Sequence, residues 1–481
     1  MIQPELKAYR RCSDRHVLVL ETNLTYVEKC QIFHYADLIR KAGNELTGIM
    51  KKRYDQLVRT KRYRKLKSLY KKYKDADNKK ALKDVCDQMK EMQKQYDVTW
   101  DYCRTSMIPI GKKYGIDAVF ALTKAEDVFH GIEKCLYSDG ETIHFKKRGD
   151  LPCIRAKQIN RGIIMKQMNF KFKNMEFGVN IKDRYEQEEV DAILYYLKNA
   201  ELMDSIVANT YKETDICVST YRPCYVSLVC KKIRSKLRVY VHITIEGLSK
   251  PKQDRFGNFK HSRGSGVVGC DIGTQTIAYT TETKAGLKNL AERGSSIEVN
   301  ERKERRIYRA MDRSRRATNP DNYNEDGTIK KGKKKWTYSN RYKKLRTKHT
   351  ELCRINATNR HLAINEDVND LRSLGDIFVT EPKNAKKLQK RAKTGKRKKR
   401  YGRSIKNRCP GYFQSQAKRK FRIYVEVPND YKASQYDHTS DEYIKKSLSQ
   451  RMYKLSDGTM VQRDLYSSFL LYCIDLNTNK I

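Results

Sequence analysis

Three acidic residues stand beside short apolar segments of the kind that form core strands and helices. Asp271 ends the run VVGCD, Glu381 ends DIFVTE, and Asp464 opens DLYSSFLLY. Strand-like runs that alternate with longer helical patterns indicate an α/β domain. Two strand ends and one helix of such a domain can bring distant groups together. We therefore expect the three carboxylates to lie close to one another, although they are far apart in the chain.

The elements around these residues have a definite predicted order, beginning at Gly266. They are strands at 267–271, 276–280 and 295–299, helices at 301–317 and about 339–371, a strand at 376–381, a helix, a strand at 421–427, and a helix at about 461–474. This is the order of the ribonuclease H-like fold.

Carboxylates at such positions suit phosphodiester cleavage. That reaction needs an activated water and a stabilised leaving oxygen, and two Mg²⁺ ions about 4 Å apart provide both. Mg²⁺ prefers hard oxygen ligands and keeps some of its waters, so a few carboxylates suffice. We expect Asp271, Glu381 and Asp464 to be both catalytic and metal-binding, with two Mg²⁺ ions for which Mn²⁺ can substitute. Each residue alone has an ordinary alternative, as a D-x-G turn, a strand-end charge or a helix N-terminal acid.

The charge of the chain indicates a polyanionic partner. Lys and Arg number 102 against 57 Asp and Glu, a net charge of +45. Such an excess repels itself unless a polyanion neutralises it, and a long nucleic acid does so with release of counterions. The alternative is a merely soluble basic surface, but the charge far exceeds what solubility needs.

Two basic stretches are candidates for contact with nucleic acid. In residues 51–74, tyrosines are interleaved with Lys and Arg, so that phosphates and bases could both be held. The alternative is a solvated helix whose tyrosines pack on a neighbour. Residues 383–403 form a basic tract directly after Glu381, or else a solvated loop. The candidate contact residues are Lys51, Arg53, Arg62, Arg64, Lys386, Lys387, Lys390, Arg391, Arg397 and Arg400.

The first half of the chain has a different texture. A strand is predicted at 16–23, and helical periodicity then runs from about residue 31 to 128. Short β-like segments follow, at 141–145, 217–230 and 237–245, and residues 248–266 form a basic, turn-rich linker. We expect a small barrel or twisted sheet that includes the first strand, with the helical part inserted into it.

Cysteine and histidine usage excludes several classes of protein. The 13 cysteines include no C-x-x-C pair, which argues for reduced thiols in a cytoplasm. No signal segment is present and no apolar run approaches a membrane span. The nine histidines contain no H-x-x-x-H pattern, so none is assigned a catalytic role.

The motifs GCDIG, FVTEP with its basic tract, and VQRDLYSSF resemble the three RuvC motifs of TnpB, the transposon-encoded RNA-guided nucleases, which compact type V CRISPR effectors share. Residues 129–151 also resemble the wedge region of that family. The resemblance implies an α+β multidomain protein: a wedge barrel at 1–30 and 129–265, a helical recognition lobe at 31–128, and a RuvC-like nuclease domain at 266–481 with a helical insertion at about 301–371.

The sequence departs from the family pattern in two places. The family usually carries a four-cysteine zinc site between the second and third motifs, but here Asp437, Ser440, Lys454 and Asp457 stand in those positions. A structural zinc needs thiolate or imidazole ligands, so the segment at about 433–460 is expected to hold none. Tyr466 stands where the family commonly has Asn, which affects substrate positioning more than the carboxylates.

The resemblance implies an RNA-guided DNA endonuclease with guide RNA and target double-stranded DNA as partners. The guide would pair with the target while the protein reads a short flanking motif. It implies a cytoplasmic, nucleoid-associated protein of a prokaryote, with no membrane partner, acting as a monomer or as a dimer on one RNA. The alternatives are a guide-dependent repressor with weak or no cleavage and a guide-independent structure-specific nuclease.

Overall fold

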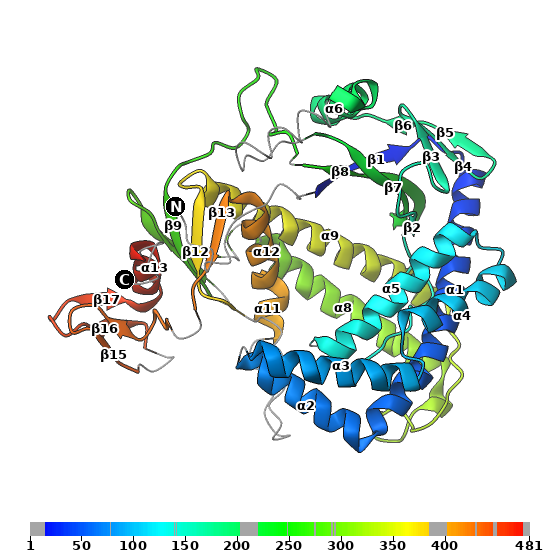
Figure 1. Ribbon diagram of the computed structural model, residues 1–481, viewed down its shortest axis with the longest axis horizontal. Helices are drawn as coiled ribbons and strands as arrows, with labels where there is room; N and C mark the ends of the chain where they lie inside the picture. The colour runs from blue at the N-terminus through cyan, green and yellow to red at the C-terminus, as the bar shows by residue number, and fades with distance from the viewer. Residues whose placement is uncertain are drawn as a thin grey trace. The chain divides into compact units, whose positions relative to one another are not determined.

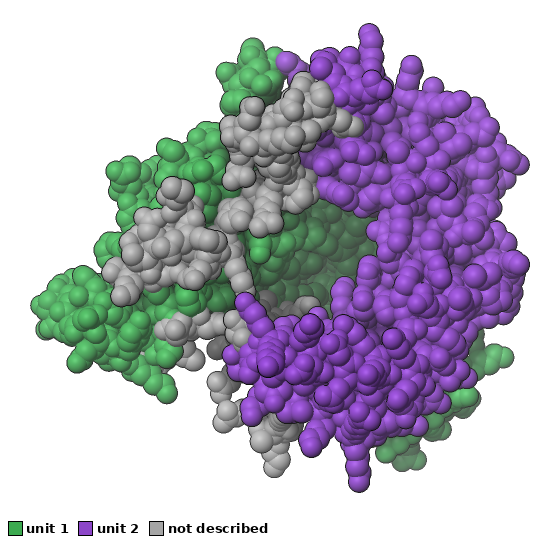
Figure 2. Space-filling view, viewed as in Figure 1, with its two compact units in different colours: residues 1–11, 251–481 green, residues 12–250 purple. Residues whose placement is uncertain are grey.

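The computed structural model describes residues 15–76, 78–138, 140, 142–202, 220–247, 249–273, 276–289, 292, 295–383, 402–428, 431–445 and 450–474 (Figure 1). The protein is a mixed α+β structure with several sheets. Its described residues divide into two compact units, one within residues 12–250 and the other within residues 251–481 (Figure 2).

Five helices form most of the first unit, in the region where helical periodicity predicts them. Helix α1 begins at a capping box, in which Thr25 and Glu28 satisfy each other's backbone N–H groups. Thr60 ends α1 and caps the next helix with its hydroxyl oxygen. The buried stripe of α1 packs against α4 and α5. The helices are α1 (Tyr26–Arg59), α2 (Lys61–Asp75), α3 (Lys79–Gln95), α4 (Trp100–Lys113) and α5 (Ala118–Tyr137).

An antiparallel sheet of five strands completes this unit, in the order β2-β7-β8-β1-β6. The tight β7–β8 hairpin turns at Arg234 and Ser235, which both have positive φ. The strands expected near residues 16–23 and 237–245 are confirmed, and closure of the sheet into a barrel stays a prediction. The remaining elements are β1 (Arg15–Thr22), β2 (Ile154–Arg155), β3 (Ile163–Lys166), β4 (Asn169–Phe172), β5 (Met175–Phe177), β6 (Val179–Asn180), α6 (Arg184–Lys198), β7 (Pro223–Ile233) and β8 (Lys236–Glu246).

The strand predicted at 141–145 is wrong for its described residues. Residues 142–147 have no regular secondary structure. Their backbone groups find a side-chain partner instead of a strand: the Lys146 N–H donates to Asn44 Oδ1 at 2.8 Å, and the Lys146 carbonyl accepts from Asn44 Nδ2 at 2.9 Å. Lys146 is therefore anchored to α1, with both of its backbone polar groups satisfied there.

The second unit contains a five-stranded mixed sheet in the order β11-β10-β9-β12-β13. Strands β9, β12 and β13 are parallel, and β10 and β11 are antiparallel to β9 and to each other. Gly273 turns β9 into β10, and a Cβ there would lie 2.5 Å from the Thr276 carbonyl. The strands are β9 (Val267–Ile272), β10 (Thr276–Thr280), β11 (Ala285–Asn289), β12 (Ile377–Thr380) and β13 (Ile423–Glu426).

The third strand of this sheet is not where the sequence predicts it. The expectation of a strand at 295–299 is wrong, because α8 (Ser295–Thr318) begins there. The strand is β11, which follows a tight turn closed by a hydrogen bond from the Thr281 N–H to the Lys284 carbonyl. Val299 is exposed on this helix, so its apolar side chain was misleading as an indication of a core strand.

Helices cover both faces of this sheet, which explains why its central strands are apolar throughout. In β12, Phe378 packs on one face with α9 and α12, while Val379 packs on the other face with α13. Helix α13 comes unusually close to β9, since a Cβ at Gly269 would lie 2.3 Å from the Ser468 carbonyl oxygen. The remaining elements are η1 (Pro320–Asn322), α9 (Asn340–Arg372), α11 (Gly402–Arg408), α12 (Pro410–Lys420), β14 (Tyr436–Asp437), β15 (Glu442–Tyr443), β16 (Met452–Lys454), β17 (Met460–Gln462) and α13 (Arg463–Cys473).

Within the described residues, no helix combines the length and the apolar character needed to cross a bilayer.

Candidate active site

Asp271 and Glu381 occupy neighbouring positions at the carboxyl ends of two parallel strands. The register pairs Thr380 of β12 with Cys270 of β9, so the next residue along each strand is Glu381 and Asp271 respectively. Side chains alternate between the faces of a strand. Cys270 and Phe378 pack on the α9 side, and Asp271 and Glu381 are therefore directed to the face covered by α13.

Asp464 lies in the first turn of α13, on the helix that covers this same face. Ser468, one turn further along, is bonded through its hydroxyl to the Thr280 hydroxyl of β10 at 2.8 Å. Residues four apart share one side of a helix, so Asp464 belongs to the stripe that faces the sheet. These contacts direct all three carboxylates to the α13 side of the sheet, and the expectation that they lie close to one another stays a prediction.

The carboxylates do not form a closed cluster. Among the described residues, the three are not a group whose ligand atoms all lie within 4.8 Å of one another. Asp464 is instead paired with two guanidinium groups, Arg451 at 2.9 Å and Arg463 at 3.0 Å. Asp271 Oδ1 is paired with the Lys383 ammonium at 2.6 Å. Each of these acids is thus neutralised by a nearby side-chain cation.

Among the described residues, Glu381 has no ion-pair partner of this kind. Its Oε1 accepts a hydrogen bond from the Ala433 N–H at 2.8 Å. Burial raises the pKa of the Glu381 carboxyl, and the charge of Asp271 raises it further, while the Ala433 N–H and Lys383 oppose the shift. A carboxyl group whose pKa is raised by burial and by a neighbouring carboxylate is a common feature of functional sites.

The donor set at this edge fits Mg²⁺. It consists of hard carboxylate oxygens from two strand ends and a helix, which is the chemistry that Mg²⁺ prefers. The Lys383 ammonium is already bonded to the Asp271 carboxylate, and the same carboxylate would stabilise a metal cation in place of that ammonium. Asp271, Glu381 and Asp464 would hold the ions.

The segment at 433–460 is held together by a buried carboxylate. Asp437 Oδ1 accepts from the N–H and hydroxyl of Thr439, and Oδ2 accepts from the N–H and hydroxyl of Ser456, all at 2.7–3.0 Å. Burial alone would raise the pKa of Asp437, but these donors outweigh it and lower the pKa to about 2. One carboxylate therefore joins the β14 and β16 turns, a role that a metal ion could otherwise fill.

Tyr466 takes part in the same segment. Its hydroxyl accepts from the His438 N–H at 3.1 Å and is 2.6 Å from His438 Nδ1. The ring also packs near Tyr453 and Phe469. Tyr466 thus ties α13 to the 433–460 segment.

The basic stretch at 51–74 is divided between core and surface. Tyr54 and Tyr63 are buried in the helical core, so these two tyrosines pack on neighbours and do not offer faces to bases. Lys51 pairs with Asp55 at 2.5 Å, and Arg53 lies near Tyr102 and Asp97. The candidate residues Lys386, Lys387, Lys390, Arg391, Arg397 and Arg400 lie outside the described residues, and most of the 383–403 tract does too.

Sequence reasoning missed one cluster of metal-ligating groups. Glu304, His349 and Cys353 bring an oxygen, a nitrogen and a sulfur together between α8 and α9. His349 and Cys353 are four residues apart on one helix, a spacing that a search for H-x-x-x-C would have found. The contribution of Glu304 depends on the pairing of the two helices and has no local signal.

Comparison with known proteins gives distant structural similarity and no sequence match. No protein-family model matches the sequence, and no curated protein matches it. Among solved structures, a chain of the cryo-EM structure of the Cas12f1–sgRNA–target DNA complex superposes with a TM-score of 0.43 at 10% sequence identity, over 96% of this chain and 99% of that one.

Proposed function

We propose that this protein is an RNA-guided DNA endonuclease with one two-metal RuvC-like site. The observation that carries the proposal is the register of β9 and β12, which puts Asp271 and Glu381 side by side on the face of the sheet that α13 covers. The strand order β11-β10-β9-β12-β13, with three parallel strands and an antiparallel hairpin, supports a ribonuclease H-like domain. The motif resemblance and the net charge of +45 both indicate that the substrate is a nucleic acid.

Asp271, Glu381 and Asp464 would hold the metal ions, which when bound activate a water and stabilise the leaving oxygen of the phosphodiester. Asp271 lies within β9, where it is paired with Ala278 of β10, and Glu381 directly follows the last residue of β12. Asp464 is carried by a helix that packs closely on β9. Arg451 and Arg463, which pair with Asp464, would add positive charge beside a bound phosphodiester.

Two other functions remain as alternatives. A guide-dependent repressor would bind RNA and DNA in the same way with little or no cleavage, and the presence of all three carboxylates argues against it. A structure-specific nuclease would need no guide. The large basic helical region within residues 12–250 exceeds what such an enzyme needs.

The deciding experiment is to purify the protein from its host, sequence the RNA that accompanies it, and test cleavage of a matching duplex in Mg²⁺. Abundant RNA from one locus with guide-dependent cleavage would support the proposal. Absence of bound RNA together with cutting of branched DNA would favour the structure-specific nuclease. Guide-dependent binding without cleavage would favour the repressor.

A further inference from the structure

Helices α8 and α9 run antiparallel and bring three different ligand types to one place. Asn300 bonds to Asn356 and Ser314 to Ser339 across the pair, each at 2.8 Å. Between these two contacts lie Glu304 of α8 and, on one face of α9, His349 and Cys353. All three side chains are partly buried.

The distances among the three ligand atoms match a tetrahedral metal site. Glu304 Oε1 is 3.6 Å from His349 Nε2 and 3.6 Å from Cys353 Sγ, and His349 Nε2 is 3.8 Å from Cys353 Sγ. Zinc bonds of about 2.0 Å to nitrogen and oxygen and about 2.3 Å to sulfur, at tetrahedral angles, put such ligands roughly 3.3–3.6 Å apart. Closing the three atoms around an ion would need shifts of only a few tenths of an ångström.

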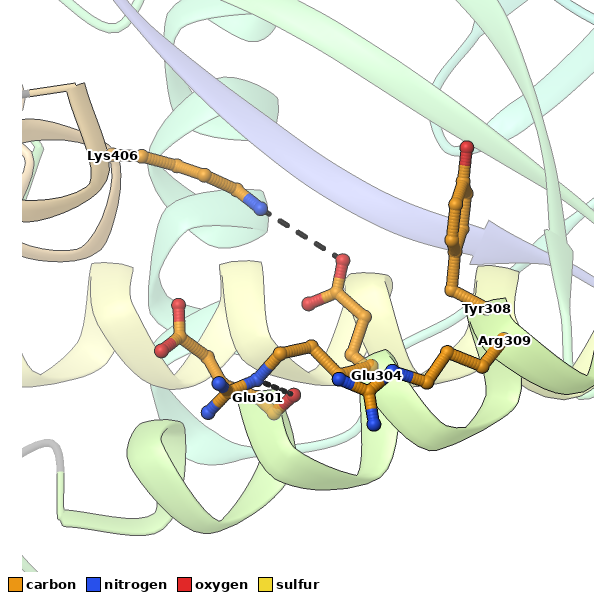
Figure 3. A pocket seen from close by; sticks show the side chains of 6 residues that line it. Glu301, Glu304, Tyr308, Arg309 and Lys406 are labelled. Carbon is orange, nitrogen blue, oxygen red and sulfur yellow. Dashed lines mark hydrogen bonds and ion pairs between the residues drawn. The ribbon is translucent and has the colours of Figure 1, made fainter. Parts of the chain in front are cut away.

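A cavity gives access to this cluster. It has a volume of about 310 Å³ and is lined by Glu304, Tyr308 and Lys406, with Glu301, Arg305 and Arg309 (Figure 3). The Lys406 ammonium lies 3.8 Å from Glu304 Oε1. An ion entering here would therefore compete with Lys406 for the glutamate.

We propose that Glu304, His349 and Cys353 form an exchangeable site for a divalent transition-metal ion of the zinc class, beyond the three carboxylates and beyond the proposed nuclease function. The fourth position is left for solvent, so the site is open and differs from a four-ligand structural zinc. On binding, the Cys353 thiol, which otherwise donates to Glu304 Oε1, releases its proton to solvent and the thiolate sulfur bonds to the ion.

Such an ion would link the two helices. Because it binds the paired helices and not the unfolded chain, it stabilises the α8–α9 hairpin by mass action. The expected consequence is a rise in the thermal midpoint of the protein with rising zinc concentration, at fixed Mg²⁺.

The test uses Co²⁺ as a spectroscopic probe on the full-length protein, with Zn²⁺ competition. The expected result is one Co²⁺ per chain with a thiolate charge-transfer band in the near ultraviolet. Cys353→Ser should abolish that band, and His349→Gln and Glu304→Gln should each weaken binding by more than about tenfold, because each loses one of three ligands. Cys86→Ser, which changes a partly buried cysteine on α3, is the matched control and should leave the band unchanged.

Lys406→Gln provides a test that does not depend on loss of function. Removing the competing ammonium should tighten Co²⁺ binding several-fold. Unchanged or weaker binding in Lys406→Gln, or a charge-transfer band that survives in Cys353→Ser, would overturn the assignment. Absence of stoichiometric Co²⁺ from the folded wild-type protein would show that the three groups form only a hydrogen-bonded network.

Discussion

At the scale of single residues, the candidate site is a set of acids balanced by side-chain cations. Asp271 is paired with Lys383, and Asp464 is paired with two arginines. Glu381 lies near the negative charge of Asp271, and within the described part of the chain its hydrogen-bond donor is the Ala433 N–H. A divalent ion would replace several of these interactions at once. The side-chain cations paired with Asp271 and Asp464 would therefore influence how tightly a divalent ion binds there.

Removal of any one carboxylate should stop cleavage. In Asp271→Asn, Glu381→Gln and Asp464→Asn we expect cleavage of guide-matched duplex in Mg²⁺ to fall by at least about 10²-fold, because each change removes a charged metal ligand. RNA affinity should stay within about twofold of wild type, since no phosphate contact is lost. Glu282→Gln, an exposed acid at the β10–β11 turn, is the control. Full cleavage by one of the three variants would exclude that residue from the site.

Lys383→Ala should change the metal requirement. With the ammonium gone from Asp271, the carboxylate is free for the ion, so the Mg²⁺ concentration for half-maximal cleavage should fall several-fold. The measurement is a Mg²⁺ titration of initial rates at constant ionic strength, beside Lys284→Ala, an exposed lysine at the turn between β10 and β11. A higher Mg²⁺ requirement would instead identify Lys383 as a contributor to catalysis.

His242 should make the protein sensitive to acid. Burial lowers the pKa of this imidazole on β8, Lys231 adds to the shift, and together they bring the pKa to about 4. The neutral form is favoured in the folded state, so stability is fully present above about pH 6.5 and is lost as the pH falls toward 4. Thermal midpoints of RNA-free protein between pH 7 and 4.5 should fall less in His242→Gln than in wild type or in His130→Gln, an exposed histidine of α5. Equal acid sensitivity in all three would assign the effect to other groups.

At the scale of elements, the 433–460 segment shows how one buried carboxylate can hold two turns together. Four donors converge on Asp437, and Tyr466 adds contacts from α13. A carboxylate can only accept hydrogen bonds, so it joins two turns that each offer an N–H and a hydroxyl. A zinc ion would need four thiolates or imidazoles at the same place.

Asp437→Ala should unfold this segment locally. The change leaves buried donors without an acceptor, at a cost of roughly 3 kcal/mol or more. Hydrogen exchange of residues 433–460 should accelerate strongly, while β9 and β12 keep their protection. Asp457→Ala, which removes an exposed carboxylate that bonds to Thr459 two residues away, should have a much smaller effect. A zinc signal in the wild-type protein that persists in Cys353→Ser would contradict the expectation of no zinc here.

The elements predicted best from the sequence are those whose apolar pattern results from burial between layers of the domain. β9, β12, β13 and α13 are apolar because they form the centre of a layered domain, and their carboxylates stand out for that reason. Segments whose partners are side chains were predicted poorly. Residues 142–147 bond to Asn44, and β11 depends on a turn at Thr281. The bonds from Ser456 to Asp437 and the meeting of Glu304 with α9 join residues that are far apart in the chain, so they have no local pattern.

At the scale of the whole molecule, the charge of +45 is the dominant property. Exposed basic residues repel one another in the free protein, and each phosphate that neutralises one of them releases counterions. Most of the 383–403 tract lies outside the described residues, so its part in this balance is a prediction from sequence alone. The tract and the 51–74 helices give two separable sources of positive charge.

Affinity for the copurified RNA should fall by about 10³-fold or more between roughly 50 and 200 mM salt, as expected when six or more phosphates are neutralised. Two matched variants then locate the contacts. One replaces the tract residues Lys386, Lys387, Lys390, Arg391, Arg397 and Arg400 with Gln and keeps Lys383, and the other replaces Lys51, Arg53, Arg62 and Arg64 with Gln.

If the tract guides DNA to Glu381, the first variant should lose cleavage while keeping RNA affinity and its salt slope. The second variant should lose RNA affinity with a shallower slope, because each lost phosphate contact removes nearly one unit from the slope. Collapse of RNA affinity in the first variant would move the tract to the guide interface. No change in either variant would place the nucleic-acid contacts on other basic residues, such as those of α8, whose helix carries Arg306, Arg309 and Arg313. The salt slope thus separates charge that binds the guide from charge that only keeps the protein soluble.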